Sequence, residues 1–334
     1  MDCLWKERGE HGLCLIGQGD WLDSLNAAGI AGKGESIWLS IALCYALREM
    51  KKLAEILGEN DLAKEYQRRF KKLKRIINTV GWDGEWYLMA FNDIGEKIGS
   101  KSCSKGGKIF LNPQSWAILA GLADIERTQK IMHACDKLLK FDPGYLCFAP
   151  MYKSFDAHIG RITLWPSEGA SVYSHAVLFK ITADCVLGEG DRAWETLRRL
   201  IPAGGRTSLE DTGAEPFSVP NAYTGPEWPR PKWSCQGWWT ATADWALQTI
   251  IEYIYGARAD YDGLLIDPCL PTKWTKARIC RRFRGDIYDI KISKPEGICK
   301  GRVTLHLDGE LLKGNLIPPV GDGDIHSVTA ILEG

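Results

Sequence analysis

The chain has 334 residues, and its 42 Lys and Arg balance 42 Asp and Glu, so the formal net charge is zero. This balance argues against a nucleic-acid partner, and no apolar run approaches the ~20 residues that span a bilayer. The first residues are charged and lack a signal-peptide core, while the 11 cysteines are scattered without a C-x-x-C pair, as reduced, buried thiols are. We therefore expect a cytoplasmic protein without nucleic-acid or membrane partners.

The first informative segment in chain order is Gly17-Gln18-Gly19-Asp20-Trp21-Leu22-Asp23, in which two carboxylates flank an indole. Glycines let the backbone approach a ligand closely, and an indole offers a flat apolar face with a polar edge. A carboxyl group beside that face can be desolvated and kept protonated, as a general acid requires. The pattern favours a sugar site, because sugar rings are apolar on their faces and hydroxylated at their edges. A surface turn with one buried Trp is the alternative interpretation.

Helical patterns dominate the next part of the chain. Residues 35–57 are apolar on nearly every side, as in a buried helix, and Gly58 supplies a terminating glycine. Residues 61–79 predict an amphipathic helix with a basic outer face. Further helices are predicted at the following positions: 112–124, 126–140, 171–187, 190–201 and 239–255.

Two segments between these helices follow other patterns. Residues 82–98 alternate and contain Asn92-Asp93-Ile94-Gly95, which indicates a hairpin. Residues 202–238 are rich in Pro, Gly and Trp, and loops of that length in compact domains are usually functional. Near residue 257 the pattern becomes strand-like, with alternating segments at 286–292, 302–307 and 326–332.

These patterns predict two domains, at residues 1–256 and 257–334. Paired helices with functional loops at one end indicate an (α/α) barrel, although the chain holds too few helices to close six pairs. We therefore expect a mainly α protein, an (α/α)6-type toroid that is incomplete and truncated at its N-terminus. A small C-terminal β-sandwich domain would follow it.

Several short motifs stand in order along the chain. They lie at residues 9–23, 111–117, 173–176, 183–188, 215–217, 221–226, 237–240 and 261–264. In this order and at this spacing they resemble glycoside hydrolase family 94, the inverting β-glucoside phosphorylases, which include cellobiose, chitobiose and 1,2-β-oligoglucan phosphorylases. The resemblance covers nearly the whole chain but only the C-terminal part of a full-length family member.

The resemblance implies roles at the sugar. Asp23 matches the family's general acid, and Trp21 matches the aromatic residue that lines the sugar site. Glu168 matches a glutamate that faces the acceptor sugar. Asp20 and Glu215 are further candidates for substrate binding, although Glu168 and Glu215 could equally be members of structural ion pairs.

The resemblance also implies a phosphate site, made by His175, Asn221 and Thr240. An imidazole can carry positive charge and donate hydrogen bonds, and Thr240 is expected at a helix N-terminus, where free N–H groups favour an anion. Asn221 stands where many members have glutamine and can donate one more hydrogen bond. A core histidine at 175 and a plain helix cap at 240 are the structural alternatives.

The resulting interpretation is a glycoside phosphorylase. It would carry out reversible, inverting phosphorolysis of a β-linked glucoside, such as cellobiose or a related β-glucan oligosaccharide, to α-glucose 1-phosphate. Inorganic phosphate is the co-substrate and no cofactor is expected. The six His include no H-E-x-x-H pair, so no metal site is predicted, and His11 is interpreted as structural.

Two other functions stay open. An inverting glycoside hydrolase would need a base carboxylate, for which Glu168, Asp211 and Glu215 are candidates. An inactive or complementing fragment is the second, because the N-terminal β-sandwich, linker helices and first barrel helices of the family have no counterpart here. The resemblance further suggests a homodimer.

Overall fold

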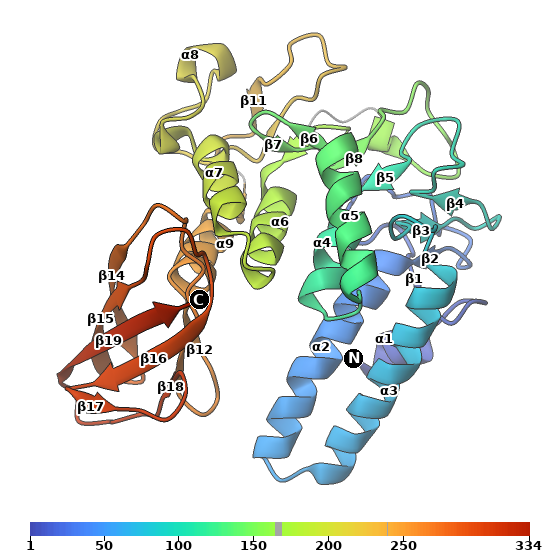
Figure 1. Ribbon diagram of the computed structural model, residues 1–334. Helices are drawn as coiled ribbons and strands as arrows, with labels where there is room; N and C mark the ends of the chain where they lie inside the picture. The colour runs from blue at the N-terminus through green and yellow to red at the C-terminus, as the bar shows by residue number, and fades with distance from the viewer. Residues whose placement is uncertain (164–168, 239) are drawn as a thin grey trace. The chain divides into compact units, whose positions relative to one another are not determined.

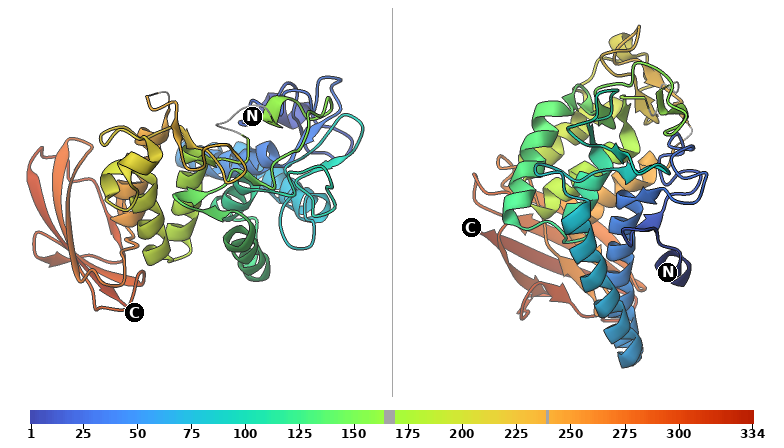
Figure 2. Two further views of the ribbon diagram at one scale, coloured as in Figure 1. Left: turned by 90° about the horizontal axis from the view of Figure 1, so that it is seen from above. Right: turned by 90° about the vertical axis from the view of Figure 1, so that its right-hand side faces the viewer.

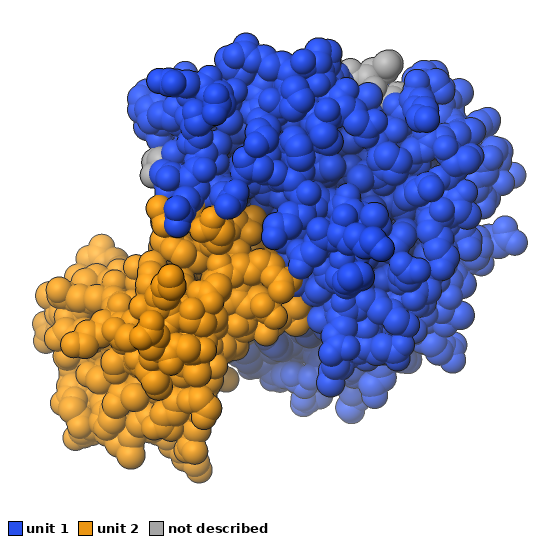
Figure 3. Space-filling model, turned by 45° about the horizontal axis from the view of Figure 1, so that its top comes forward, with its two compact units in different colours: residues 1–180, 199–240 blue, residues 181–198, 241–334 orange. Residues whose placement is uncertain are grey.

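The computed structural model describes residues 1–163, 169–238 and 240–334. These residues form two compact units, shown in Figure 3. Unit 1 comprises Met1–Lys180 and Arg199–Thr240, and unit 2 comprises Ile181–Arg198 and Ala241–Gly334. The predicted domains, 1–256 and 257–334, follow the sequence pattern instead, and they stay a prediction.

The described residues contain nine α-helices (Figure 1). They are α1 (Asp2–Lys6), α2 (Ile37–Ile56), α3 (Asn60–Val80), α4 (Leu111–Leu119), α5 (Ile125–Leu138), α6 (Ser174–Val186), α7 (Gly190–Leu200), α8 (Leu209–Thr212) and α9 (Thr242–Gln248). A π-helical turn, Thr249–Ile254, follows α9, and 3₁₀ turns lie at Arg161–Thr163 and Pro202–Gly204. No helix among these residues combines the length and the apolar character that a bilayer crossing requires.

The long helices of unit 1 form where the sequence pattern predicts them. Helices α2 and α3 lie side by side as an antiparallel pair (Figures 1 and 2). Ser36 is the N-cap of helix α2, and its hydroxyl oxygen accepts the backbone N–H of Leu39, which satisfies one of the free donors of the first turn. Asp124 caps α5 in the same way through the N–H of Arg127.

Short strands connect these helices in unit 1. One sheet has the order β1-β2-β3-β4, a second has the order β11-β10-β9, and two further pairs are β5 with β8 and β6 with β7. The strands are β1 (Cys14–Leu15), β2 (Glu35–Ser36), β3 (Ala90–Phe91), β4 (Lys97–Ile98), β5 (Ile109–Phe110), β6 (Lys140–Phe141), β7 (Gly144–Tyr145), β8 (Phe148–Ala149), β9 (Val172–Tyr173), β10 (Ala222–Tyr223) and β11 (Ser234–Cys235). Strands β2, β5 and β9 each run directly into a helix, so the sheets fix the N-terminal ends of α2, α4 and α6.

Unit 2 carries a three-stranded and a five-stranded sheet. Their strand orders are β12-β13-β18 and β14-β15-β19-β16-β17. The strands are β12 (Ala257–Ala259), β13 (Leu264–Ile266), β14 (Lys276–Phe283), β15 (Asp286–Ser293), β16 (Arg302–Leu307), β17 (Glu310–Leu311), β18 (Leu316–Ile317) and β19 (Ile325–Glu333). Strands β15 and β19 pair in parallel, whereas the other neighbours are antiparallel.

The expected mainly α toroid is wrong for this chain. In the part of the chain that the structure describes, about 35% of the residues are helical and about 21% lie in strands, with several sheets. The physical reason is the length of the connecting strands: two residues show no alternation, so β2 and β9 fell inside the helices predicted at 35–57 and 171–187. The hairpin predicted over 82–98 is present as β3 and β4, which pair Ala90 with Ile98.

Candidate active site

Trp21 lies at the centre of an aromatic cluster in unit 1. Its ring centroid is 5.0 Å from that of Tyr173, 5.3 Å from that of His175 and 5.5 Å from that of Phe179. Trp38, in the first turn of α2, lies 6.3 Å away. Two predicted site residues that are far apart in sequence, Trp21 and His175, are therefore in edge-on contact.

The position of the cluster follows from local structure. Tyr173 ends strand β9 and His175 is in the first turn of α6, so the strand delivers both rings to one place. Phe179 follows one turn later on α6 and packs 4.8 Å from the His175 ring. Trp38, Tyr173 and Phe179 were not predicted as site residues, although all three are aromatic residues within the predicted helices 35–57 and 171–187.

Asp23 is exposed on this segment. Its neighbours in the chain, Leu22 and Leu25, are 1% and 0% exposed, and the N–H of Leu25 donates to the carbonyl of Leu22 at 3.0 Å. Two buried leucines thus fix a turn from which the Asp23 carboxyl reaches solvent. Gly19 has a φ of +117°, a conformation that favours glycine.

Asp20 has partners for both carboxylate oxygens. Oδ1 accepts the backbone N–H of Leu22 at 2.9 Å, and Oδ2 accepts the hydroxyl of Ser36 at 2.6 Å. Burial raises the pKa of Asp20 to about 6, against the lowering effect of these two hydrogen bonds. The predicted contact of Asp20 with substrate stays a prediction.

The candidate phosphate residues begin with a desolvated imidazole. Burial lowers the pKa of His175 to about 4, so the ring is neutral at pH 7 in the absence of an anion. The N–H of Ser174, the residue before it, donates to the carbonyl of Asn221 at 2.9 Å. The pairing of β9 with β10 therefore brings the segments of His175 and Asn221 together.

Asn221 and Thr240 are placed differently. Asn221 is 8% exposed, and its Nδ2 donates to Oε1 of Gln236 at 2.7 Å. Thr240 precedes α9 by two residues, and Ala241 is the N-cap of that helix, without a side-chain cap. The role of Thr240 at phosphate stays a prediction.

Of the other acidic candidates, Asp211 lies in the short helix α8 and Glu215 in the loop that follows it. Glu215 and Asp211 are exposed, and Glu215 lies close to Gly237, since a Cβ built on that glycine would be 3.7 Å from Glu215 Oε2. Two exposed rings, Phe217 and Trp238, have centroids 6.1 Å apart beside it. Glu168 lies outside the described residues.

His11 belongs to a separate hydrogen-bond group. Its Nδ1 lies 2.5 Å from Glu35 Oε2, and its ring stacks on Phe91 with centroids 4.4 Å apart. Glu35 is 1% exposed, and its carboxylate also accepts the N–H of Leu13 at 3.0 Å. The structural role of His11 stays a prediction.

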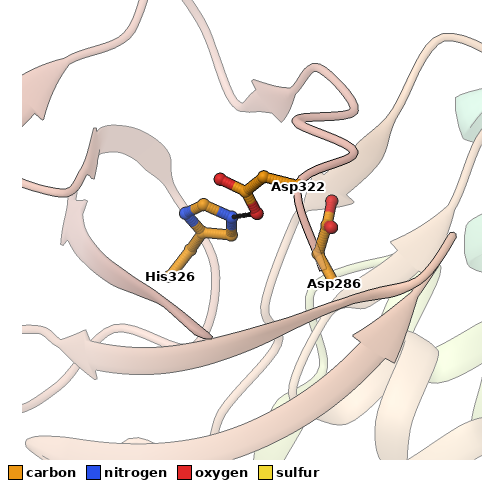
Figure 4. Close-up of side chains that lie close together, drawn as sticks. All are labelled: Asp286, Asp322 and His326. Carbon is orange, nitrogen blue, oxygen red and sulfur yellow. Dashed lines mark hydrogen bonds and ion pairs between the residues drawn. The ribbon is translucent and has the colours of Figure 1, made fainter. Parts of the chain in front are cut away.

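Within residues 1–163, 169–238 and 240–334, one group has three residues that each offer one metal-ligand atom within 4.8 Å of the others: Asp286, Asp322 and His326 (Figure 4). All three side chains already form hydrogen bonds with other groups of the protein. His326 Nε2 lies 3.1 Å from Asp322, and Nδ1 lies 2.8 Å from Asp308. Asp286 accepts the N–H groups of Gly321 and Gly323. The imidazole therefore links the loop before β19 to the β16–β17 turn through carboxylates.

Comparison with known proteins adds a family. The model described as "Glycosyl hydrolase 94 superfamily, catalytic domain" matches residues 1–256. The chain is 40% identical over 326 residues to a solabiose phosphorylase from Paenibacillus borealis, covering 96% of this chain and 42% of that protein. It is 37% identical over 337 residues to a 3-O-beta-D-glucopyranosyl-beta-D-glucuronide phosphorylase from the same organism, covering 99% and 43%. It is 35% identical over 339 residues to a cellobionic acid phosphorylase from Neurospora crassa, covering 99% and 42%.

The chain thus spans less than half the length of these relatives. Among solved structures, it is similar to a GH78 rhamnosidase from Bacillus sp. GL1, with a TM-score of 0.54 and 16% identity over 100% of this chain and 31% of that one. It is also similar to a sialidase, with a TM-score of 0.56 and 12% identity over 84% of this chain and 25% of that one. These two structures support a likeness of fold alone.

Proposed function

Since this chain belongs to the glycosyl hydrolase 94 superfamily, we propose that it carries the acid and part of the anion site of a glycoside phosphorylase. The reaction would be reversible, inverting phosphorolysis of a β-linked glucoside to α-glucose 1-phosphate. The contact between Trp21 and His175, whose ring centroids lie 5.3 Å apart, is the observation that carries the proposal. It joins the segment of the candidate acid to the candidate phosphate residue.

The proton chemistry needs a single acid. Asp23 would donate its proton to the glycosidic oxygen as the bond from that oxygen to the anomeric carbon breaks. A phosphate oxygen would form the new bond from the opposite face, which inverts the anomeric configuration. Phosphate arrives as an anion, so the second carboxylate that an inverting hydrolase uses to activate water is not required.

The remaining residues would bind and orient the two substrates. Trp21 would stack on a sugar face. The neutral His175 imidazole donates one hydrogen bond, and an approaching phosphate favours the charged imidazolium, which donates two. Asn221 keeps one amide N–H beyond the one given to Gln236, and the Thr240 hydroxyl would complete the site.

Three further statements belong to this proposal. The substrate is a β-glucoside of the kind named in the relatives, with inorganic phosphate as the second substrate. The protein works in the cytoplasm, in keeping with its 11 cysteines, all of which are free thiols. It forms a homodimer, as the family resemblance suggests.

The test is an assay of glucose 1-phosphate release. The purified chain is incubated with phosphate and a panel of β-linked glucobioses and glucosyl uronic acids, and Asp23→Asn is expected to lower the rate by about 10²-fold or more. Asp211→Asn, which removes a candidate base of the hydrolysis alternative, should leave the rate unchanged. Sugar release that does not depend on phosphate would favour hydrolysis, and the absence of product from folded chain at every linkage would overturn the proposal.

A further inference from the structure

The segment that carries Asp23 has little regular structure of its own. Between α1 and Asp23 it contains one two-residue strand, β1, and four glycines, at positions 9, 12, 17 and 19. Glycine-rich backbone loses much conformational freedom on ordering. Contacts from elsewhere in the fold must therefore hold this segment in place.

Glu35 holds the first half of the segment. Its buried carboxylate accepts the N–H of Leu13 at 3.0 Å and the N–H of His11 at 3.3 Å, in addition to its contact with His11 Nδ1. Gly9 packs directly on it, since a Cβ at that position would lie 2.4 Å from Glu35 Cδ. A side chain at position 9 would push the carboxylate out of place.

Ser36 holds the second half. Its hydroxyl oxygen accepts the N–H of Leu39 in the first turn of α2, and a hydroxyl has a single proton to donate. That proton is directed to Asp20 Oδ2, 2.6 Å away. The backbone of Ser36 pairs with Cys14 in strand β1, so the same residue touches the segment twice.

Asp20 connects Ser36 to the turn that carries Asp23. Its second oxygen accepts the N–H of Leu22, which stands directly before Asp23. A continuous path therefore runs from the start of α2 through Ser36 and Asp20 to the turn that presents Asp23.

We propose that strand β2, Glu35–Ser36, positions the acid segment, defined here as residues 7–23. We further propose that the hydrogen bonds of Asp20 fix the Asp23 end of this segment only while Asp20 is ionised. The proposal rests on the proposed function for its catalytic meaning, whereas the structural link stands by itself. Asp20 and Ser36 are positioning residues, since they act through Asp23.

Ionisation matters because both donors face the Asp20 carboxylate. A protonated carboxyl carries a hydrogen on one oxygen, and that oxygen becomes a poorer acceptor for the Ser36 hydroxyl or the Leu22 N–H. The pKa of Asp20, raised by burial to about 6, sets where this happens, and the neighbouring Asp23 also raises it. The hydrogen bonds from Ser36 and Leu22 to Asp20 should therefore weaken as the pH falls through 6.

Two pairs of variants test the link. Asp20→Asn and Ser36→Ala interrupt it. Asp83→Asn and Ser100→Ala are matched controls, because Asp83 likewise accepts a serine hydroxyl, from Ser100 at 3.0 Å, and a backbone N–H, from Lys101 at 2.8 Å. Ser36→Thr retains a hydroxyl at this position and should keep most of the wild-type behaviour.

The first readout is hydrogen exchange of the peptide containing residues 20–25, corrected for intrinsic rates. In the wild type we expect exchange about tenfold faster at pH 5 than at pH 7.5, since hydrogen bonds to charged acceptors contribute at least that factor. Asp20→Asn and Ser36→Ala should exchange fast at both pH values, and the controls should follow the wild type. Wild-type protection that is equal at both pH values, or unchanged in Ser36→Ala, would overturn the proposal.

The second readout is glucose 1-phosphate formation. Asp20→Asn and Ser36→Ala should lower kcat by about tenfold to a hundredfold with little change in KM, because a displaced acid harms the chemical step. The acid limb of the pH profile near 6 should be absent in Asp20→Asn. An inactive wild type with the expected exchange pattern would refute the proposed function and leave the link standing, whereas an active Asp20→Asn with normal kcat would refute the positioning role.

Discussion

Strands β15 and β19 of unit 2 bury every second side chain, and their inward residues include Tyr288, Ile290 and Val328, each 0% exposed. The acid segment of unit 1 is held in another way. Leu13, Ile16 and Leu22 anchor it by apolar burial, at 0%, 3% and 1% exposed, and the Glu35 carboxylate and the Ser36 hydroxyl add polar fixed points. One region relies mainly on apolar area, and the other combines apolar anchors with a few directional hydrogen bonds.

This difference has a functional meaning. Apolar burial is tolerant of small shifts and stabilises a sheet as a whole, whereas hydrogen bonds fix individual groups at defined distances. A region that must place one carboxyl group beside a sugar benefits from the second kind of support. We therefore expect core substitutions in unit 2 to lower stability, and substitutions at the polar fixed points of unit 1 to lower activity as well.

The largest effect on stability is expected in the unit 2 sheet. Ile290→Ala removes a fully buried side chain from β15 and should lower the free energy of unfolding by about 2–5 kcal/mol. Lys291→Ala, on the exposed face of the same strand, should change it by about 0.5 kcal/mol or less. Urea unfolding followed by circular dichroism checks both, and equal losses for the two variants would contradict the role assigned to the buried face.

Glu35→Ala comes next in size. It leaves the buried N–H of Leu13 without its acceptor, which should cost about 1–3 kcal/mol of stability and lower the rate of glucose 1-phosphate formation more than Ile290→Ala does. Glu65→Ala is the control, because that carboxylate pairs with Arg68 and Arg69 on the surface of α3 and such pairs contribute little. Loss of stability with full activity would show that Glu35 supports the fold without positioning the acid.

The difference between the unit 2 sheet and the acid segment also explains what could be predicted from the sequence. Periodicity placed the apolar helix over 35–57 and the structure has α2 at Ile37–Ile56; alternation placed strands at 286–292 and 326–332, close to β15 and β19. Both signals extend over many residues, because a long apolar face repeats. The two-residue strands before α2 and α6 are too short to show an alternating pattern, so they were not predicted.

The candidate site likewise contains features that have a sequence signal and features that have none. Trp21 and His175 were chosen from motifs, and the fold brings their rings into contact. The hydrogen bond from Ser36 to Asp20 could not be predicted, because it joins residues sixteen apart through a turn whose path depends on tertiary packing. Glu35 and Ser36 looked like the start of an apolar helix rather than a support for the preceding loop.

A smaller, pH-dependent effect is expected at His326 in unit 2. The hydrogen bond to Asp308, and then that to Asp322, raises the pKa of His326 above its usual 6.5. The folded state thus holds the proton more tightly, so this stabilisation is complete below pH 6.5 and is lost as the pH rises through the folded-state pKa. Thermal unfolding between pH 6 and 8.5 should show a larger fall in Tm for the wild type than for His326→Gln. Asp308→Asn, which removes the larger cause, should lie between the two, and parallel curves for all three proteins would contradict the imidazolium link.

His175 should show the opposite slope in unit 1. Burial lowers its pKa to about 4, so between pH 6.5 and 4 the unfolded chain binds a proton that the folded chain does not, and stability falls as the pH falls. His175→Gln should lose this part of the acid slope in a Tm series from pH 7 to 5, whereas His133→Gln, at an exposed position on α5, should keep it. Phosphate should raise the Tm of the wild type and of His133→Gln more than that of His175→Gln, because an anion beside the imidazole favours its charged form. An acid slope that survives in His175→Gln would place the titrating group elsewhere, and a phosphate effect that survives would remove His175 from the anion site while leaving its contact with Trp21 as packing.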